Sequence, residues 1–150
     1  MTGEEKVVRA AIVTEARSWL LTPWHHNARV KGAGVDCGQF LAAVFEAVGL
    51  VPHVETIDYP ADFMMHRDDE IFLGYVERYA TPLLNLEPLA GDVVLFRFGR
   101  VISHAGIVTQ WPEIIHAYVD TKNVTLDNVA TNLRLRERYV GAWTVFPEAK

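Results

Sequence analysis

Three side chains of this 150-residue chain could together perform nucleophilic catalysis. Cys37 is the only cysteine, and His104 and His116 lie in the apolar stretches VISHAGIV and EIIHAYV. A thiol nucleophile needs a base that removes its proton, and the base needs a third group that orients it. Cys37, His104 and His116 offer one residue for each role, so the sequence predicts a catalytic triad.

Cys37 is predicted to lie in the first turn of an amphipathic helix. Asp36 is a good N-cap residue, Gln39 follows at capping-box spacing, and Gly49 fits the C′ position after the helix. The apolar face recurs at helical spacing and consists of Phe40, Leu41, Val44, Phe45 and Val48. Because backbone N–H groups and the helix dipole favour a negative charge there, a basic partner would lower the thiol pKa from ~8.5 into the range ~3.5–7.5.

Both histidines lie in predicted strands, where an unpartnered imidazole is costly to bury. If the hairpin between their strands pairs even positions with even positions, both side chains face one side of the sheet. An odd register would separate them, so the triad depends on this register. A core histidine with a backbone partner is the alternative for each. The rivals of His116 as the third residue are close to it in sequence: Asp120, Asp127 and Asn128.

The sequence gives less support to other roles of these residues. A lone cysteine is often an inert core residue, but a capped helix start that follows glycines favours a nucleophile. Zinc could bind Cys37, His104 and His116, yet close ligand pairs are missing, so neither a metal nor a cofactor is expected. His25 and His26 lie with Trp24 in an irregular loop, where binding residues often collect and where solvent exposure is the alternative.

The remaining elements change from helical to strand periodicity along the chain. A capped helix runs from Thr2 to near Leu21, an irregular loop follows over 22–34, and 49–65 form a connection. A further helix is expected over 68–80, with acidic residues in its first turn. Strands are expected at 93–96, 101–109, 113–119, 124–127 and 139–146, with a turn at 98–100 and no assignment for 133–138. Helices followed by an antiparallel meander predict an α+β domain.

Composition limits the classes of function. A chain of 150 residues, half of them hydrophobic, suits a single domain over 1–150. The net charge is −5 and no basic stripe is visible, so no nucleic-acid partner is expected. One cysteine excludes an intrachain disulfide. The N-terminus, MTGEEKVV, has no signal-peptide pattern, and no apolar run reaches the ~20 residues of a membrane span.

Four motifs in order, GVDCGQF, GDVVLF, SHAGIV and IIHAY, resemble those of the NlpC family of papain-like cell-wall peptidases. The resemblance extends from Thr22-Pro23-Trp24 to the last strand and includes compact phage-encoded members. It implies a papain-like core in which N-terminal helices, the cysteine helix among them, pack on a small antiparallel sheet. It also implies hydrolysis of an amide in peptidoglycan stem peptides, typically between D-γ-glutamyl and meso-diaminopimelate. By position, Cys37 matches the nucleophile, His104 the base and His116 the third polar residue.

The same resemblance points to substrate-binding residues. Asp36 and Ser103 match positions that in relatives help to bind the free amine of the substrate. Gly38 replaces a common serine, and Trp24 replaces a tyrosine whose hydroxyl supports the oxyanion hole. Trp24 can donate only through its indole N–H, so the oxyanion geometry would differ.

Two classes of function follow. The first is a cysteine endopeptidase, made in the cytoplasm without a signal peptide and delivered to the periplasm or cell wall by a phage tail or similar device. Tail or baseplate proteins would then be partners of the chain, and its substrate would be a peptidoglycan stem peptide. The second is a non-catalytic tail-assembly module with the same fold. An amidase or acyltransferase acting on another substrate would use the same three residues.

Overall fold

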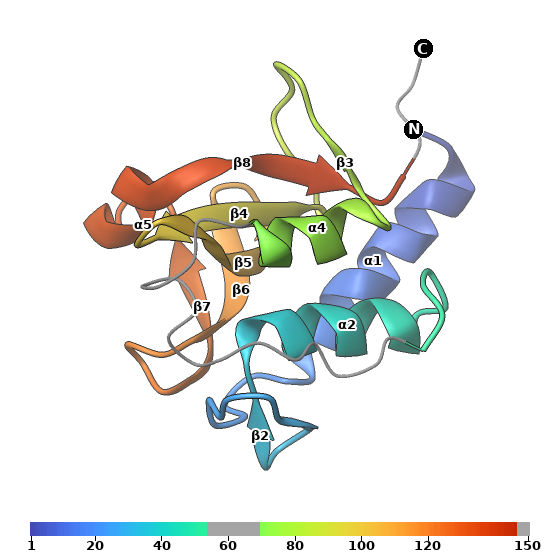
Figure 1. Cartoon of the computed structure of the whole chain (residues 1–150). Coiled ribbons are helices and arrows are strands. Elements are labelled where there is room, and N and C mark those ends of the chain that lie inside the picture. The colour runs from blue at the N-terminus through green and yellow to red at the C-terminus, as the bar shows by residue number, and fades with distance from the viewer. Residues whose placement is uncertain (54–69, 147–150) are drawn as a thin grey trace.

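A six-stranded antiparallel sheet is the centre of the computed structural model, which describes residues 1–53 and 70–146 (Figure 1). The strand order is β3-β8-β4-β5-β6-β7. The strands are β3 (Thr81–Pro82), β4 (Val93–Phe98), β5 (Val101–Gln110), β6 (Glu113–Tyr118), β7 (Asn123–Asn128) and β8 (Tyr139–Thr144). A small separate hairpin joins β1 (Arg29–Val30) to β2 (Gly34–Val35).

Helices cover both faces of this sheet. They are α1 (Gly3–Arg17), α2 (Cys37–Ala47), α4 (Ile71–Glu77) and α5 (Leu133–Arg138). The first three contribute to one apolar cluster with the odd-numbered residues of β4, whereas α5 packs with the even-numbered residues on the other face. Because successive strand residues point to opposite faces, two covered faces explain the uninterrupted apolar run Val93–Phe96. None of the described helices is both long and apolar enough to cross a membrane.

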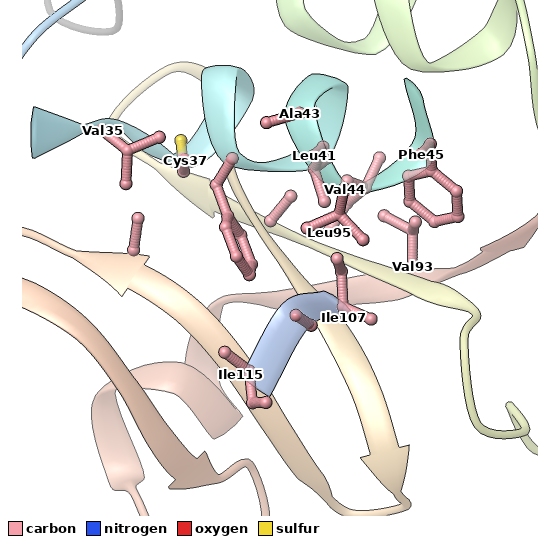
Figure 2. Packing of buried hydrophobic residues seen from close by; sticks show 14 of the residues in the cluster. Val35, Cys37, Leu41, Ala43, Val44, Phe45, Val93, Leu95, Ile107 and Ile115 are labelled. Atoms are coloured by element: carbon pink, nitrogen blue, oxygen red, sulfur yellow. The ribbon is translucent and has the colours of Figure 1, made fainter. Parts of the chain in front are cut away.

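The cysteine helix is firmly packed against the sheet. Figure 2 shows Leu41 and Val44 of α2 facing Leu95 and Ile107 of the sheet, with Cys37 at the start of the helix. Leu95 and Ile107 are fully buried, and Leu41 and Val44 are nearly or fully so. A helix fixed in this way holds its first turn at a constant position relative to β5. The predicted α+β fold, with N-terminal helices packed on an antiparallel sheet, is confirmed.

Several boundaries differ from the sequence-based expectation. Helix α1 ends at Arg17 and not near Leu21, because the following residues form tighter i→i−3 bonds and Leu21 adopts a positive φ of 72°. Residues 133–138, which the sequence left unassigned, form α5, and Asn132 caps it by accepting from the Leu135 N–H at 3.3 Å. The short β1, β2 and β3 were not predicted.

The predicted helix over 68–80 is observed as the shorter α4. Glu70, at its N-cap, makes no side-chain cap bond; its carboxylate accepts from the N–H of Ile102 in β5 at 3.0 Å. The expected acidic residues Asp68 and Asp69 lie outside the described residues, as does most of the predicted connection over 49–65. The turn between β4 and β5 is observed, and Gly99 has the positive φ of 78° that such a turn accommodates most easily in glycine.

Candidate active site

Asp36 fixes the start of α2. Its Oδ1 accepts from the N–H of Gln39 at 2.9 Å, which confirms the predicted N-cap, and its Oδ2 accepts from the N–H of Asn27 at 2.7 Å. The carboxylate is almost completely buried, and its two bonds join the loop before α2 to the first turn of the helix. Cys37 is therefore the first helical residue in a rigid setting, as expected.

The thiol of Cys37 lies against the backbone of β5 on both sides of His104. Sγ donates to the carbonyl of Ser103 at 3.5 Å, and the N–H of Ala105 points to the sulfur from the other side. Within the described part of the chain, no hydrogen bond joins the thiol to the imidazole of His104. The sulfur thus lies beside the β5 backbone at His104, and the thiol hydrogen is directed at the carbonyl of Ser103.

The two histidines are in direct contact. Nε2 of His104 and Nδ1 of His116 are 2.7 Å apart. Strands β5 and β6 pair Ile107 with Ile115 and Val108 with Ile114, and the register shifts only beyond Val108, toward the turn. Even positions therefore oppose even positions near the histidines, and the predicted common side for both imidazoles is confirmed.

Gly106 permits this close approach of the two strands. A Cβ at this position would lie 3.4 Å from Cβ of His116 and 2.7 Å from Cδ1 of Ile114. The second of these distances is shorter than carbon atoms tolerate, so a larger residue would push the neighbouring side chain away. The glycine of the SHAGIV motif thus has a packing role beside the histidine pair.

The second ring nitrogen of His116 contacts Asp127. Nε2 of His116 is 3.1 Å from Oδ2 of Asp127, which lies on the neighbouring strand β7. Asp127 also accepts from the side-chain amide of Asn132 at 3.0 Å and from the N–H of Asn128 at 2.8 Å. Of the three rivals named for the third role, Asp120 pairs instead with Arg134 at 2.6 Å. Asn132 was missed, since nothing in its sequence context signals this contact.

Aromatic rings surround the histidine pair and exclude water from it. Tyr118 stacks on His116 with ring centroids 4.5 Å apart, and Phe96 and Phe98 lie 5.6 and 5.7 Å from the ring of His104. Burial lowers the pKa of His104 well below its ordinary value, and a charge on His116 would lower it further. Burial also lowers the pKa of His116, although Asp127 opposes this effect. Both imidazoles are therefore neutral at pH 7.

The expected lowering of the thiol pKa is wrong. Burial raises the pKa of Cys37 far above its ordinary value, and the Asp36 carboxylate raises it further, against the N–H groups of Ala105, Gly38 and Cys37 itself. The helix start supplies the predicted donors, but the loss of hydration outweighs them because the thiol is buried. The resting protein holds a neutral thiol beside neutral histidines.

Alkylation of Cys37 by iodoacetamide is expected to require a higher pH than alkylation of a free thiol. Only the thiolate reacts, and the raised pKa keeps it scarce, so the rate should still be rising above pH ~8.5, where a free thiol is half ionised. Mass spectrometry of the intact protein over a pH series measures the midpoint, which is the pH at which the alkylation rate is half its maximum. Urea-unfolded protein is the control and should regain the midpoint of a free thiol. A folded-state midpoint below ~8.5 would contradict the expectation.

The expected substrate-binding residues lie near the thiol in different settings. Ser103 directly precedes His104 in β5, and its Oγ donates to the carbonyl of Phe98 at 3.2 Å. Trp24 is half-buried and forms a β-bridge with Val35, close to the start of α2. Among the described residues, its indole N–H has no hydrogen-bond partner. The roles of Asp36, Ser103 and Trp24 toward a substrate stay predictions.

A zinc site built from the three central residues is not supported by their contacts. Nε2 of His104 and Nδ1 of His116 are directed at each other, so these nitrogens cannot bind a common ion. In residues 1–53 and 70–146, no group of three His, Cys, Asp or Glu side chains is arranged to hold a metal.

A buried cysteine at the start of a helix, packed on an antiparallel sheet that carries a histidine pair, defines a papain-like α+β fold. The model of the NlpC/P60 family matches residues 22–144, and the chain belongs to this family. The sequence-based assignment is thereby confirmed. No curated protein matches the chain.

Solved structures of low sequence identity share the fold. The NlpC/p60 domain of the peptidoglycan hydrolase SagA is 20% identical, with a TM-score of 0.66, over 91% of this chain and 97% of that one. An NlpC/P60 family protein from Bacillus cereus is 17% identical, with a TM-score of 0.67; 93% of this chain matches 40% of that longer one. RipD from Mycobacterium tuberculosis, described as a non-catalytic domain adapted to peptidoglycan binding, is 11% identical, with a TM-score of 0.59, over 91% and 95% of the two chains.

Proposed function

We propose that the chain is a cysteine endopeptidase that hydrolyses an amide bond in peptidoglycan stem peptides. The observation that carries this proposal is the buried contact between His104 and His116 beside the thiol of Cys37. A purely structural core would more simply hold apolar side chains at these two positions, because each buried imidazole needs hydrogen-bond partners. The similarity to the SagA hydrolase domain supports the same substrate class.

His104 acts as the base and His116 orients it. Since Nε2 of His104 is engaged with His116, Nδ1 is the nitrogen that accepts the thiol proton. Sulfur attacks the amide carbonyl carbon as the proton moves, because a neutral resting thiol must be deprotonated in the step itself. His104 then gives this proton to the leaving amine, and a thioester remains on Cys37. Water hydrolyses the thioester, with His104 accepting the water proton and returning it to the thiol.

Backbone donors at the start of α2 stabilise the oxyanion. The N–H of Cys37 lies in the first helical turn, and the indole N–H of Trp24 is a candidate for the second donor. Losing one such donor typically costs ~10²–10³ in rate. The carboxylate of Asp36 has about four lone-pair sites, and two accept backbone N–H groups. Oδ2 also lies 3.8 Å from Nδ1 of His26. Asp36 and Ser103 are the proposed contacts of the free amine of a stem peptide.

The proposed scissile bond is the one between D-γ-glutamyl and meso-diaminopimelate. Resemblance to compact phage-encoded members supports delivery to the periplasm or cell wall by a phage tail or similar device. Tail or baseplate proteins would then hold the chain.

The acid limb of kcat/KM is expected below pH ~6.5, the ordinary histidine pKa. His104 must be neutral to accept a proton, and burial lowers its pKa well below this value. The neutral form therefore persists as the pH falls through 6.5, and activity is lost only at lower pH. Initial rates with a synthetic stem peptide over a pH series would measure the limb. A midpoint at or above 6.5 would show that His104 is not the titrating base.

Digestion of purified peptidoglycan, with fragments identified by mass, tests the proposed reaction. The expected products carry a new meso-diaminopimelate amine, and Cys37→Ala protein should yield none. Fragments cut elsewhere would indicate an amidase of another specificity. Binding to peptidoglycan without any product would support a non-catalytic role, which the similarity to RipD makes the second candidate.

A further inference from the structure

A hydrogen-bonded series of side chains extends from the histidine pair to the surface of the sheet. It runs from His104 to His116 at 2.7 Å, from His116 to Asp127 at 3.1 Å and from Asp127 to Asn132 at 3.0 Å. These residues come from β5, β6, β7 and the N-cap of α5. Asp127 is the only member with a fixed negative charge, and it touches neither Cys37 nor His104 within the described structure.

We infer that Asp127 is a positioning residue that sets the tautomers of both histidines, leaving Nδ1 of His104 free of a proton. An ionised carboxylate only accepts hydrogen bonds, so Nε2 of His116 must carry the hydrogen at this contact. A neutral imidazole has one N–H, so Nδ1 of His116 is an acceptor. The 2.7 Å contact then requires the hydrogen on Nε2 of His104. Nδ1 of His104 keeps its lone pair, as the proposed function requires of the base.

The surroundings of Asp127 keep it ionised and oriented. Partial burial would raise its pKa, but the bonds from His116, the N–H of Asn128 and the amide of Asn132 outweigh burial and lower it. Asn132 cannot turn its amide freely, because its Oδ1 caps α5 by accepting from the N–H of Leu135 while its Nδ2 donates to Asp127. Its amide nitrogen therefore faces Oδ2 of Asp127, beside Nε2 of His116.

Asp127→Asn combined with Asn132→Ser should reverse the directions of the hydrogen bonds in the series. With Asn132 in place, its amide nitrogen would compete for the new amide oxygen at the position of Oδ2. Asn132→Ser removes this donor and keeps a side-chain oxygen for the N–H of Leu135. In the double variant, the backbone N–H of Asn128, which cannot turn, retains the amide oxygen at the position of Oδ1. The amide nitrogen then points to His116 and donates to Nε2. His116 must carry its hydrogen on Nδ1, His104 accepts through Nε2, and the hydrogen of His104 moves to Nδ1. Nδ1 of His104 then carries a hydrogen and cannot accept the thiol proton.

The test combines kinetics with a spectroscopic reading of the tautomers. If the proposed function holds, the double variant Asp127→Asn with Asn132→Ser should lower kcat by ~10²–10⁴, the usual contribution of a positioned base, with little change in KM. Asn132→Ser alone keeps Asp127 and should lose far less. Asp127→Ala removes the hydrogen-bond partner of His116 without reversing the series, so its kcat should fall less than that of the double variant. Asp120→Asn is the matched control, because it removes the same charge close to the site without touching either histidine, and it should keep wild-type kcat.

Nitrogen-15 NMR of histidine-labelled protein without substrate reads the tautomers directly. Wild type and Asp120→Asn should show protonated Nε2 on His104 and His116. The double variant Asp127→Asn with Asn132→Ser should show protonated Nδ1 on both. Wild-type protein with protonated Nδ1 on His104 would overturn the inference, even if the variant failed to fold. A folded double variant, Asp127→Asn with Asn132→Ser, that kept the wild-type tautomers would overturn it as well. These readings need no activity, so failure of the proposed hydrolysis would be seen separately.

Discussion

Replacing Cys37 with alanine is expected to lower kcat/KM for a stem peptide by ~10⁴-fold or more, and His104→Ala should cause a similar loss. Cys37 supplies the bond-forming atom, which no neighbour can replace. His104 removes its proton, and a buried thiol with a raised pKa does not ionise unaided. Because both groups act in one step, the double variant should lose no more than the worse single variant. Rates of peptide hydrolysis, followed by chromatography of the released fragments, measure all three.

Stability measurements keep this comparison interpretable. Cys37→Ala only removes a sulfur from a small side chain, so its thermal unfolding should stay close to that of wild type, and stem-peptide binding should persist. A fully active Cys37→Ala protein would show that another residue is the nucleophile. Full activity of His104→Ala, with Cys37→Ala inactive, would leave the nucleophile in place and require a different base.

The elements that position the site could be predicted because their signals are local. Asp36 and Gln39 mark the helix start within four residues, and the observed cap joins the Asp36 carboxylate to the Gln39 backbone N–H. The side chain of Gln39 does not complete the capping box; its oxygen accepts from Arg29. Likewise, the apolar runs of β4, β5 and β6 predicted the bounds of these strands to within a few residues. The common side of His104 and His116 followed from an assumed register, which the pairing of Val108 with Ile114 confirms.

Other features depend on tertiary packing and left no local signal. The thiol pKa was expected to fall because helix-start donors can be recognised in sequence, whereas the burial that raises it depends on how α2 meets β5. The contact of Asp127 with His116 depends on the register of β6 against β7. Asn132 could be recognised as a cap only after α5 was known. The hydrogen bonds that join side chains from different elements could therefore be predicted only in part from the sequence.

His116→Ala is expected to reduce kcat by up to ~10⁴-fold, the cost of losing the orienting group in comparable triads. The variant leaves Nε2 of His104 without its partner in a site where His116 is fully buried. His104 can then turn or hold its hydrogen on the wrong nitrogen. His116→Asn should lose less, because its amide oxygen can accept from His104 while its amide nitrogen donates to Asp127. Single-turnover rates of thioester formation measure the difference, since they isolate the step in which His104 takes the proton.

The ranking of these two variants decides the role of His116. Both remove an imidazole from the same buried position, so packing losses affect both, and thermal unfolding of each variant would measure that loss separately. If His116 only filled space, the activities of the two variants would follow their stabilities. If it orients His104, the asparagine variant should retain more activity than its stability alone explains. Full activity of His116→Ala would assign the orienting role elsewhere, with Cys37 and His104 unaffected. That result would also overturn the positioning role inferred for Asp127, because its carboxylate reaches His104 only through His116.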